Sequence, residues 1–248
     1  NLVRAGMLGE IHHAECAYIH DLRELLFDRE HVGPWRRLEH LKRDGNLYPT
    51  HGLGPVAWYL DIHRGDRFER LVSMSSPSLG LQGYRDRALA GDDSRRQETY
   101  ACGDMNTSLL RTARGRTVVL QHDVVSPRPY SRINMVSGTK GTFADYPARV
   151  FLDGQKEHAW QELRQRDGRA PGGIEDRFED PLWKRLAGPA EQGGHGGMDY
   201  VMSWRLVQCL REGLPPDMDV YDAAAWSAPA ALSEQSVAGG NVSVEFPD

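Results

Sequence analysis

The sequence predicts an α+β fold built on a large, mainly antiparallel β-sheet. Strand patterns rich in Val, Leu, Ile and Thr occupy residues 68–75, 104–112, 116–126, 131–137 and 142–146. Their links are short, as at Arg114-Gly115, and short links join antiparallel neighbours. Helical periodicity is found at residues 52–62, at 198–212 and from about 222 to Gly239.

Composition limits the class of protein. The chain has 248 residues, and we expect one domain over residues 1–248. Its net charge is −5 and no basic stripe is present, so nucleic acid is not an expected partner. No apolar run approaches the roughly 20 residues that span a bilayer. Cys16, Cys102 and Cys209 are widely spaced, which argues against a disulfide framework and a zinc site.

The first residues predict a helix tail followed by a strand. Asn1–Met7 is typical of the end of a helix, and the strand covers residues 10–18. Alternation places Tyr18 on one face with Ala14 and Cys16. His12 and His13 then point to opposite faces and do not form a metal-binding pair, so no metal site is predicted.

Residues 21–44 are charged and are expected to be irregular, with a break at Gly33-Pro34. Arg36 follows this break beside Trp35. A surface arginine is usually a solvated charge. Here a rigid fork of guanidinium donors ahead of the next motif also suits a clamp on a substrate oxygen.

The next motif is Tyr48-Pro49-Thr50-His51 at the start of the helix predicted at 52–62. Pro49 and Thr50 favour a helix start, Pro by its fixed φ and Thr by side-chain capping. His51 therefore lies at the positive end of the helix dipole, which favours its neutral form. Neutral imidazole donates and accepts hydrogen bonds, which suits orientation of a sugar hydroxyl. The alternative is a rigid helix entry with incidental polar residues.

The remaining segments are mostly polar. Residues 86–97 are expected to form a surface loop, and Tyr130 to lie at a strand edge. Residues 153–197 predict a long excursion with short helices. Its Gly-Gly-His-Gly-Gly run has no Lys-Ser/Thr after it and is no P-loop, although His195 within it can face a pocket. Residues 241–246 predict a closing strand.

Gly45-Asn46-Leu47 followed by Tyr-Pro-Thr-His-Gly resembles the signature of family 109 glycoside hydrolases. These are NAD-dependent α-N-acetylgalactosaminidases of the Gfo/Idh/MocA oxidoreductase superfamily. The resemblance continues in the same order along nearly all of the chain, at residues 1–4, 9–11, 18–23, 35–36, 129–131, 138–141 and 193–200. The segment at residues 21–44 is shorter than is usual in the family, which would alter the wall of the sugar pocket.

The resemblance implies the C-terminal domain of that superfamily: an open-faced sheet with helices on one face. It also implies a homo-oligomer formed through the open face. The sequence has no Gly-x-Gly-x-x-Gly between a strand and a helix, so we expect a substrate-binding part whose dinucleotide-binding domain is absent from this chain. Alone it would bind NAD poorly. Its compartment stays open between exported and cytoplasmic.

The family's chemistry implies hydrolysis of terminal α-linked N-acetylgalactosamine by oxidation, elimination, addition and reduction, without the usual carboxylate pair. Tyr18 would be the base at C2, and His51 would orient or deprotonate the C3 hydroxyl. Tyr48 would lie between nicotinamide and sugar, and the remaining sugar-binding residues would be Arg36, Pro49, Thr50 and Tyr130. A tyrosine base needs a lowered pKa, which Arg36 is expected to supply.

Two other functions remain open on the sequence alone. One is an NAD(P)-dependent sugar dehydrogenase of the same superfamily, which would accumulate NADH with a free sugar. The other is a non-catalytic sugar-binding fragment, which would bind carbohydrate without turnover.

Overall fold

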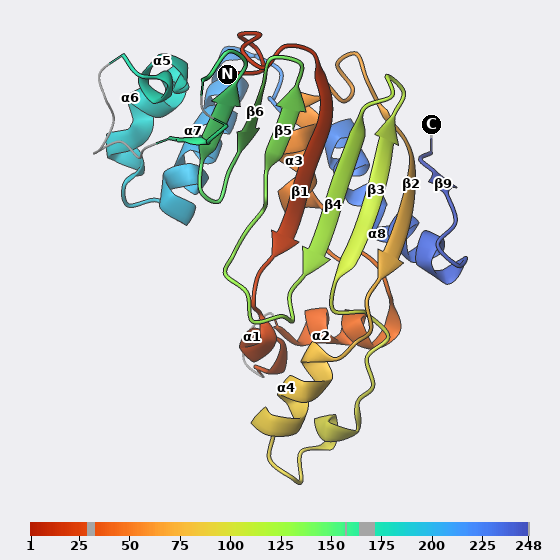
Figure 1. Ribbon diagram of the computed structural model, residues 1–248. Helices are drawn as coiled ribbons and strands as arrows, with labels where there is room; N and C mark the ends of the chain where they lie inside the picture. The colour runs from red at the N-terminus through yellow and green to blue at the C-terminus, as the bar shows by residue number, and fades with distance from the viewer. Residues whose placement is uncertain (29–32, 157, 164–171, 248) are drawn as a thin grey trace.

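In the computed structural model, which describes all residues except 29–32, 157, 164–171 and 248, nine strands form one sheet. The strand order is β8-β7-β6-β5-β1-β4-β3-β2-β9 (Figure 1). The strands are β1 (Ile11–Ile19), β2 (Phe68–Ser75), β3 (Asn106–Thr112), β4 (Thr117–Asp123), β5 (Met135–Gly138), β6 (Gly141–Ala144), β7 (Arg149–Leu152), β8 (Gln161–Glu162) and β9 (Val244–Glu245). All neighbours are antiparallel except β1 and β4, which run parallel with Tyr18 opposite His122.

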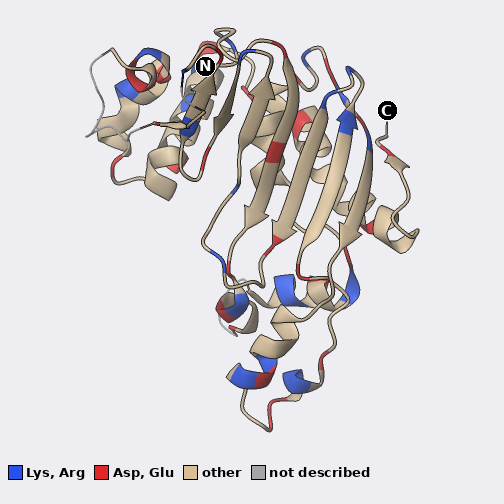
Figure 2. Ribbon diagram, in the orientation of Figure 1, with Lys and Arg blue, Asp and Glu red and all other residues tan. Residues whose placement is uncertain are grey.

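Helices α3 (Thr50–Tyr59) and α8 (Val220–Ala238) lie behind the sheet, and its other face is uncovered by the described residues (Figure 1). The main core fills the space between this sheet and the two helices, with Leu53, Leu71 and Leu120 fully buried. We call β1–β4 with α3 and α8 the body. Its strands carry few charged side chains (Figure 2). The fold class predicted from the sequence is confirmed.

A second group of helices lies beyond the carboxyl ends of β1 and β4 (Figure 1). It consists of α1 (Arg23–Phe27), α2 (Gly33–Lys42), α4 (Gly80–Ala88) and the 3-10 turn η1 (Ser94–Gln97), and we call it the helical lobe. Its apolar cluster is separate from the main core and includes Leu26, Phe27 and Leu81. Charged side chains are dense here (Figure 2).

The remaining helices flank the β7–β8 edge of the sheet (Figure 1). They are α5 (Ile174–Phe178), α6 (Pro181–Ala190), the 3-10 turn η3 (His195–Gly197) and α7 (Met198–Glu212). Short helices within 153–197 and the helix at 198–212 agree with the sequence prediction. None of the helices among the described residues is long and apolar enough to cross a bilayer.

Several expectations were wrong in detail. The described residues of 21–44 are largely helical instead of irregular, because Leu26 and Phe27 bury an apolar side of α1 against α2. Residues 86–97 hold the end of α4 and η1 instead of a plain loop. Residues 1–8 form hydrogen-bonded turns instead of a helix tail. Residues 29–32 of the segment at 21–44, which is expected to be shortened, lie outside the described part of the chain.

The sheet also differs from expectation at its edge. Strands β7 and β8 were not predicted, since the charged residues around them hide the short apolar run of β7. Residues 131–134 do not belong to β5, because Ile133 and Asn134 adopt positive φ and interrupt the strand.

Candidate active site

The predicted site residues gather where β1 ends, between the body and the helical lobe. Tyr18 is the centre of this cluster and is 7% exposed. Its ring centroid lies 4.8 Å from that of Tyr48 and 5.1 Å from that of His51. The Tyr130 ring is 6.2 Å away, edge to face. The structure therefore brings together four aromatic or imidazole rings that the sequence placed in three separate segments.

Close packing of α3 on β1 holds His51 beside Tyr18. Gly52 makes this possible, because a Cβ at this position would lie 2.8 Å from the backbone N and O of Ala17. Pro49 is buried and serves as the N-cap residue of α3, and Thr50 is its first residue. The expectation that Thr50 caps the helix was wrong, because the N-cap is one residue earlier and makes no side-chain cap.

The loop before α3 is fixed from two sides. The backbone N–H of Asn46 donates to Ser233 Oγ of α8 over 2.8 Å. The Asn46 Oδ1 atom accepts a hydrogen bond from the backbone N–H of Tyr48 over 3.1 Å. Asn46 is fully buried, so this turn sets the direction of Tyr48 without help from solvent. Asn46 of the Gly-Asn-Leu segment before the motif therefore has a structural role, which is to hold the turn that leads into α3.

Arg36 of α2 reaches the cluster from the lobe. Its guanidinium lies 4.8 Å from the centroid of the Tyr48 ring and 4.7 Å from that of Trp35. A guanidinium stacked on aromatic faces is held by cation–π attraction while its edge stays available for hydrogen bonds. Arg36 is therefore placed to act on the site through the rings as well as on a ligand.

The expected lowering of the pKa of Tyr18 is not found. Burial raises the pKa of Tyr18 above its ordinary value, and the opposing effects of Arg36 and Arg132 do not overcome it. The phenol is therefore protonated at neutral pH. The hydroxyl of Tyr18 lies 3.2 Å from His20 Nδ1, the one side-chain hydrogen bond it makes within the described residues.

His51 is held neutral. Its pKa is lowered chiefly by burial, with contributions from Arg132 and Arg36. The direction agrees with the sequence argument, although burial is the main cause. The pKa of His20 is lowered as well, chiefly by burial and then by Arg36. Two neutral imidazoles, each able to accept a proton, therefore flank the Tyr18 ring.

Sequence reasoning missed Arg132. Its Nε donates to the hydroxyl of Tyr130 over 2.6 Å, and its charge acts on both Tyr18 and His51. The signal was its position two residues after Tyr130, on the segment that crosses the end of β1. His20 follows the last residue of β1, two residues after Tyr18, and this spacing is the signal that places its side chain near the Tyr18 hydroxyl.

His195 lies at the edge of this region. Its side chain is 71% exposed and its Nδ1 lies 2.8 Å from Asp199 Oδ2. Its charge contributes to the lowered pKa of His51, so it is within electrostatic reach of the site. Among the described residues, no group of three or more His, Cys, Asp or Glu is arranged to hold a metal ion.

Solved structures with this fold are oxidoreductases of low sequence identity. An NAD binding oxidoreductase from Klebsiella pneumoniae aligns over the whole chain, 61% of its own length, with a TM-score of 0.70 and 14% identity. Levoglucosan dehydrogenase, in complex with NADH and levoglucosan, aligns over 99% of this chain and 61% of its own, with a TM-score of 0.65 and 17% identity. These likenesses show that the chain shares the fold of part of these oxidoreductases.

Sequence relatives are much closer. A glycosyl hydrolase family 109 protein from Solibacter usitatus is 55% identical over 249 residues, covering all of this chain and 55% of the relative. A Shewanella oneidensis protein named alpha-N-acetylgalactosaminidase is 50% identical over 254 residues, covering all of this chain and 54% of the relative. The chain thus spans about half the length of the curated relatives it matches. The family model for the glycosyl hydrolase 109 C-terminal domain matches residues 1–248, and the chain belongs to that family.

Proposed function

We propose that the protein containing this chain hydrolyses terminal α-linked N-acetylgalactosamine by an NAD-dependent mechanism. The observation that carries the proposal is the convergence of Tyr18, Tyr48, His51 and Tyr130 at the end of β1. One family relative bears the name of this activity, and several neighbours in fold are dehydrogenases solved with NADH. The name of this relative together with the fold of these dehydrogenases supports a glycosidase that uses a nicotinamide cofactor.

The residues present fit one side of a nicotinamide site. Tyr48 offers a ring held by Arg36, next to the two groups that would act on the sugar, Tyr18 and His51. The chain has no glycine-rich phosphate cradle, so we propose that a separate dinucleotide-binding domain holds most of the cofactor. When bound, NAD would supply reversible oxidation at C3 of the sugar, which makes the C2 proton acidic.

The chain's own residues would manage the protons. Neutral His51 accepts the proton of the C3 hydroxyl. Tyr18 takes the C2 proton, and because its phenol is protonated, its own proton must leave towards His20 Nδ1 at 3.2 Å. His20, held neutral, can accept it. The electrons of the C2–H bond then form the C1–C2 double bond, the C1–O bond breaks, and the aglycone leaves with a proton from solvent. Water adds across the double bond, its hydroxyl at C1 and a proton at C2, and reduction at C3 completes the hydrolysis. Arg36 and Tyr130 hold sugar oxygens, and Pro49 and Thr50 shape the same wall.

The first test is hydrolysis of p-nitrophenyl α-N-acetylgalactosaminide by the full-length protein, with and without added NAD⁺. We expect turnover that depends on bound NAD and leaves no net NADH. NADH accumulation with free sugars would favour the alternative of a sugar dehydrogenase. Saturable sugar binding with no turnover would favour a non-catalytic carbohydrate-binding module.

The proton route has its own test. Tyr18→Phe should abolish exchange of the C2 hydrogen with deuterated solvent while cofactor binding, measured by fluorescence, is retained. His20→Phe should slow that exchange by about 100-fold, in the range typical of general acid–base groups. Exchange that persists in Tyr18→Phe would remove Tyr18 from the role of base.

We also propose a homo-oligomer formed through the open face of the sheet. Leu109 and Met74 are more than half exposed on this face, and Val72, Leu109 and Val119 are direct neighbours across β2, β3 and β4. Apolar surface of this kind favours association. A light-scattering mass equal to one chain would contradict the proposal.

A further inference from the structure

A cavity of about 350 Å³ lies between α2 and the end of β4, apart from the aromatic cluster. Its walls come from Trp35, Arg36 and His40 of α2, from Leu47, and from His122 and Val124. Arg36 is the one residue of the predicted sugar site in its wall. The cavity therefore adjoins the proposed sugar site through Arg36, and its other wall residues have no role in the mechanism proposed above.

Two buried imidazoles in this wall have no partner. His40 and His122 are each 3% exposed, and their ring centroids lie 6.4 Å apart. Neither imidazole makes a side-chain hydrogen bond among the described residues, and their ring nitrogens are not fully enclosed by protein atoms. Both residues line the cavity, so the polar atoms of a ligand there can hydrogen-bond to them.

The charge state of the wall selects the kind of ligand. Burial lowers the pKa of His40 to about 4 and that of His122 to about 3, so both are neutral and each offers one donor and one acceptor. Arg43 is paired with Glu39 and Glu234, and together with Arg36 these are two positive and two negative charges, which balance. The buried Arg36 Nε has no acceptor among the described residues. The wall thus suits a neutral group that both accepts and donates.

The cavity lies directly behind the proposed base. The His122 ring is nearly parallel to the Tyr18 ring, with 6.3 Å between centroids, and the two residues are register partners in β1 and β4. Arg36 joins the two spaces, since its guanidinium also covers Tyr48. A substituent on the carbon that loses its proton to Tyr18 would therefore be the part of the sugar nearest this cavity.

We propose that the cavity between α2 and β4 receives the acetamido group on C2 of the sugar and selects 2-acetamido over 2-hydroxy substrates. An acetamide has one carbonyl acceptor and one N–H donor, and it carries no charge. Its carbonyl would accept from Arg36 or an imidazole, and its N–H would donate to the other imidazole. Its methyl group would contact Leu47 and Val124. This inference deepens the proposed function and rests on it.

The kinetic test compares two substrates on the full-length protein, p-nitrophenyl α-N-acetylgalactosaminide and p-nitrophenyl α-galactoside. His40→Phe removes one polar partner, and Leu47→Trp fills the cavity while leaving both imidazoles in place. We expect kcat/KM for the acetamido substrate to fall by about 10-fold or more relative to the galactoside, because unpaired polar groups discriminate strongly. The control is His12→Phe, an exposed residue at the other end of β1. An equal fall for both substrates in both variants would overturn the inference.

A binding test separates this inference from the glycosidase proposal. Imidazole ¹⁵N signals of His40 and His122 are followed while N-acetylgalactosamine or galactose is added to the full-length protein. Shifts with N-acetylgalactosamine alone support the cavity's role, even if no hydrolysis is found. Hydrolysis accompanied by equal shifts with both sugars, or by none, would retain the glycosidase and reject the subsite. Melting temperatures of the variants show whether either has lost its fold.

Discussion

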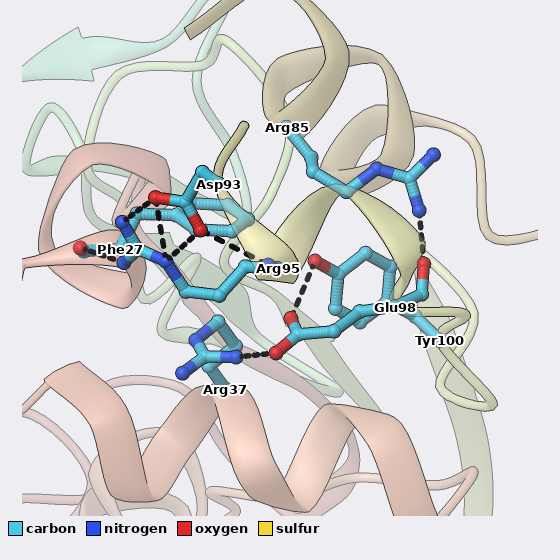
Figure 3. Close-up of polar contacts among 7 residues, drawn as sticks. All are labelled: Phe27, Arg37, Arg85, Asp93, Arg95, Glu98 and Tyr100. Carbon is cyan, nitrogen blue, oxygen red and sulfur yellow. Dashed lines mark hydrogen bonds and ion pairs between the residues drawn. The ribbon is translucent and has the colours of Figure 1, made fainter. Parts of the chain in front are cut away.

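The body and the helical lobe are stabilised in different ways. In the body, Leu53, Leu71 and Leu120 are fully buried between the sheet and its two helices. In the lobe, a smaller apolar cluster is accompanied by ion pairs of low exposure (Figure 3). Arg37 of α2 pairs with Glu98, whose other oxygen accepts from the Tyr100 hydroxyl over 3.1 Å. Arg95 pairs with Asp93 and donates to the Phe27 carbonyl oxygen over 2.6 Å.

This difference bears on the site between them. The body holds the backbone of Tyr18 in β1 beside β4, while its side chain packs in the apolar cluster of the lobe. His51 is held beside it by the close packing of α3 on β1. The lobe positions Arg36 through α2. The next residue of that helix, Arg37, forms an ion pair with Glu98. The geometry of the proposed site thus combines a part held by apolar contact with a part held by directional charge pairs. Substitutions in the two regions should therefore change the free energy of unfolding by different amounts, with different signs and with different pH dependence.

The largest effect is expected where the body has no spare room. Gly52→Val would place a branched side chain against the Ala17 backbone, where even a Cβ approaches to 2.8 Å. Overpacking against backbone, with the lower helix propensity of Val, should reduce the free energy of unfolding by about 3 kcal/mol or more. Urea denaturation of the full-length protein measures it. A loss below about 1 kcal/mol would show that α3 can move away from β1 freely.

The next effect comes from the lobe's ion pairs. Glu98→Gln leaves Arg37, 11% exposed, without its carboxylate. Breaking a buried pair typically costs 3–5 kcal/mol, and the 19% exposure of Glu98 moderates this to roughly 2 kcal/mol. Because α2 also carries Arg36, sugar binding should weaken along with stability. Unchanged stability would mean that solvent replaces the carboxylate, and that the lobe depends on its apolar cluster as the body does.

A pH effect is expected at the boundary, where His40 of the lobe faces His122 of the body. Both have pKa values lowered from 6.5 by burial, to about 4 and about 3. Between pH 6.5 and 4 the unfolded chain binds protons at these positions that the folded chain does not. The free energy of unfolding should therefore fall as pH falls, by about 1.4 kcal/mol per pH unit for each imidazole.

Two matched variants show which histidine causes this pH dependence of the free energy of unfolding. His40→Phe should remove its share of the pH dependence, measured as urea midpoints between pH 7 and 4.5. His12→Phe, at an exposed position, should retain the parent slope. Equal slopes in the parent and His40→Phe would indicate that another group carries the pH dependence.

The sequence revealed the body better than the lobe. Strand alternation and the helix period report burial on a single face, and these patterns predicted β1 to β4 and α3 of the body. The lobe escaped because Arg37, Arg85 and Arg95 look like solvent-exposed charges in a sequence, yet each is folded inward onto a carboxylate or carbonyl (Figure 3). Periodicity has no sign for an ion pair between residues 61 apart, such as Arg37 and Glu98.

The site divides in the same way. The local motif at the start of α3 indicated Tyr48 and His51. The family resemblance indicated Tyr18 and gave all three residues roles that remain predictions. Arg132 and the His40–His122 pair depend on contacts between distant segments, for which one sequence offers no pattern. The pKa direction of Tyr18 was also beyond reach, since it is a balance between burial and two guanidinium groups.

The smallest effect should have the opposite sign and come from the lobe. Gly83 lies inside α4, and a Cβ there would meet only the flexible end of Arg87, at 3.8 Å. Gly83→Ala should raise the free energy of unfolding by roughly 0.5–1 kcal/mol, because alanine loses less backbone entropy in a helix. The same measurement as for Gly52→Val applies, and Gly52→Ala provides the matched change in α3, where the Cβ contact should make it destabilising. Destabilisation by Gly83→Ala would show that α4 is packed as tightly as α3, and the contrast between the two regions would then rest on the ion pairs alone.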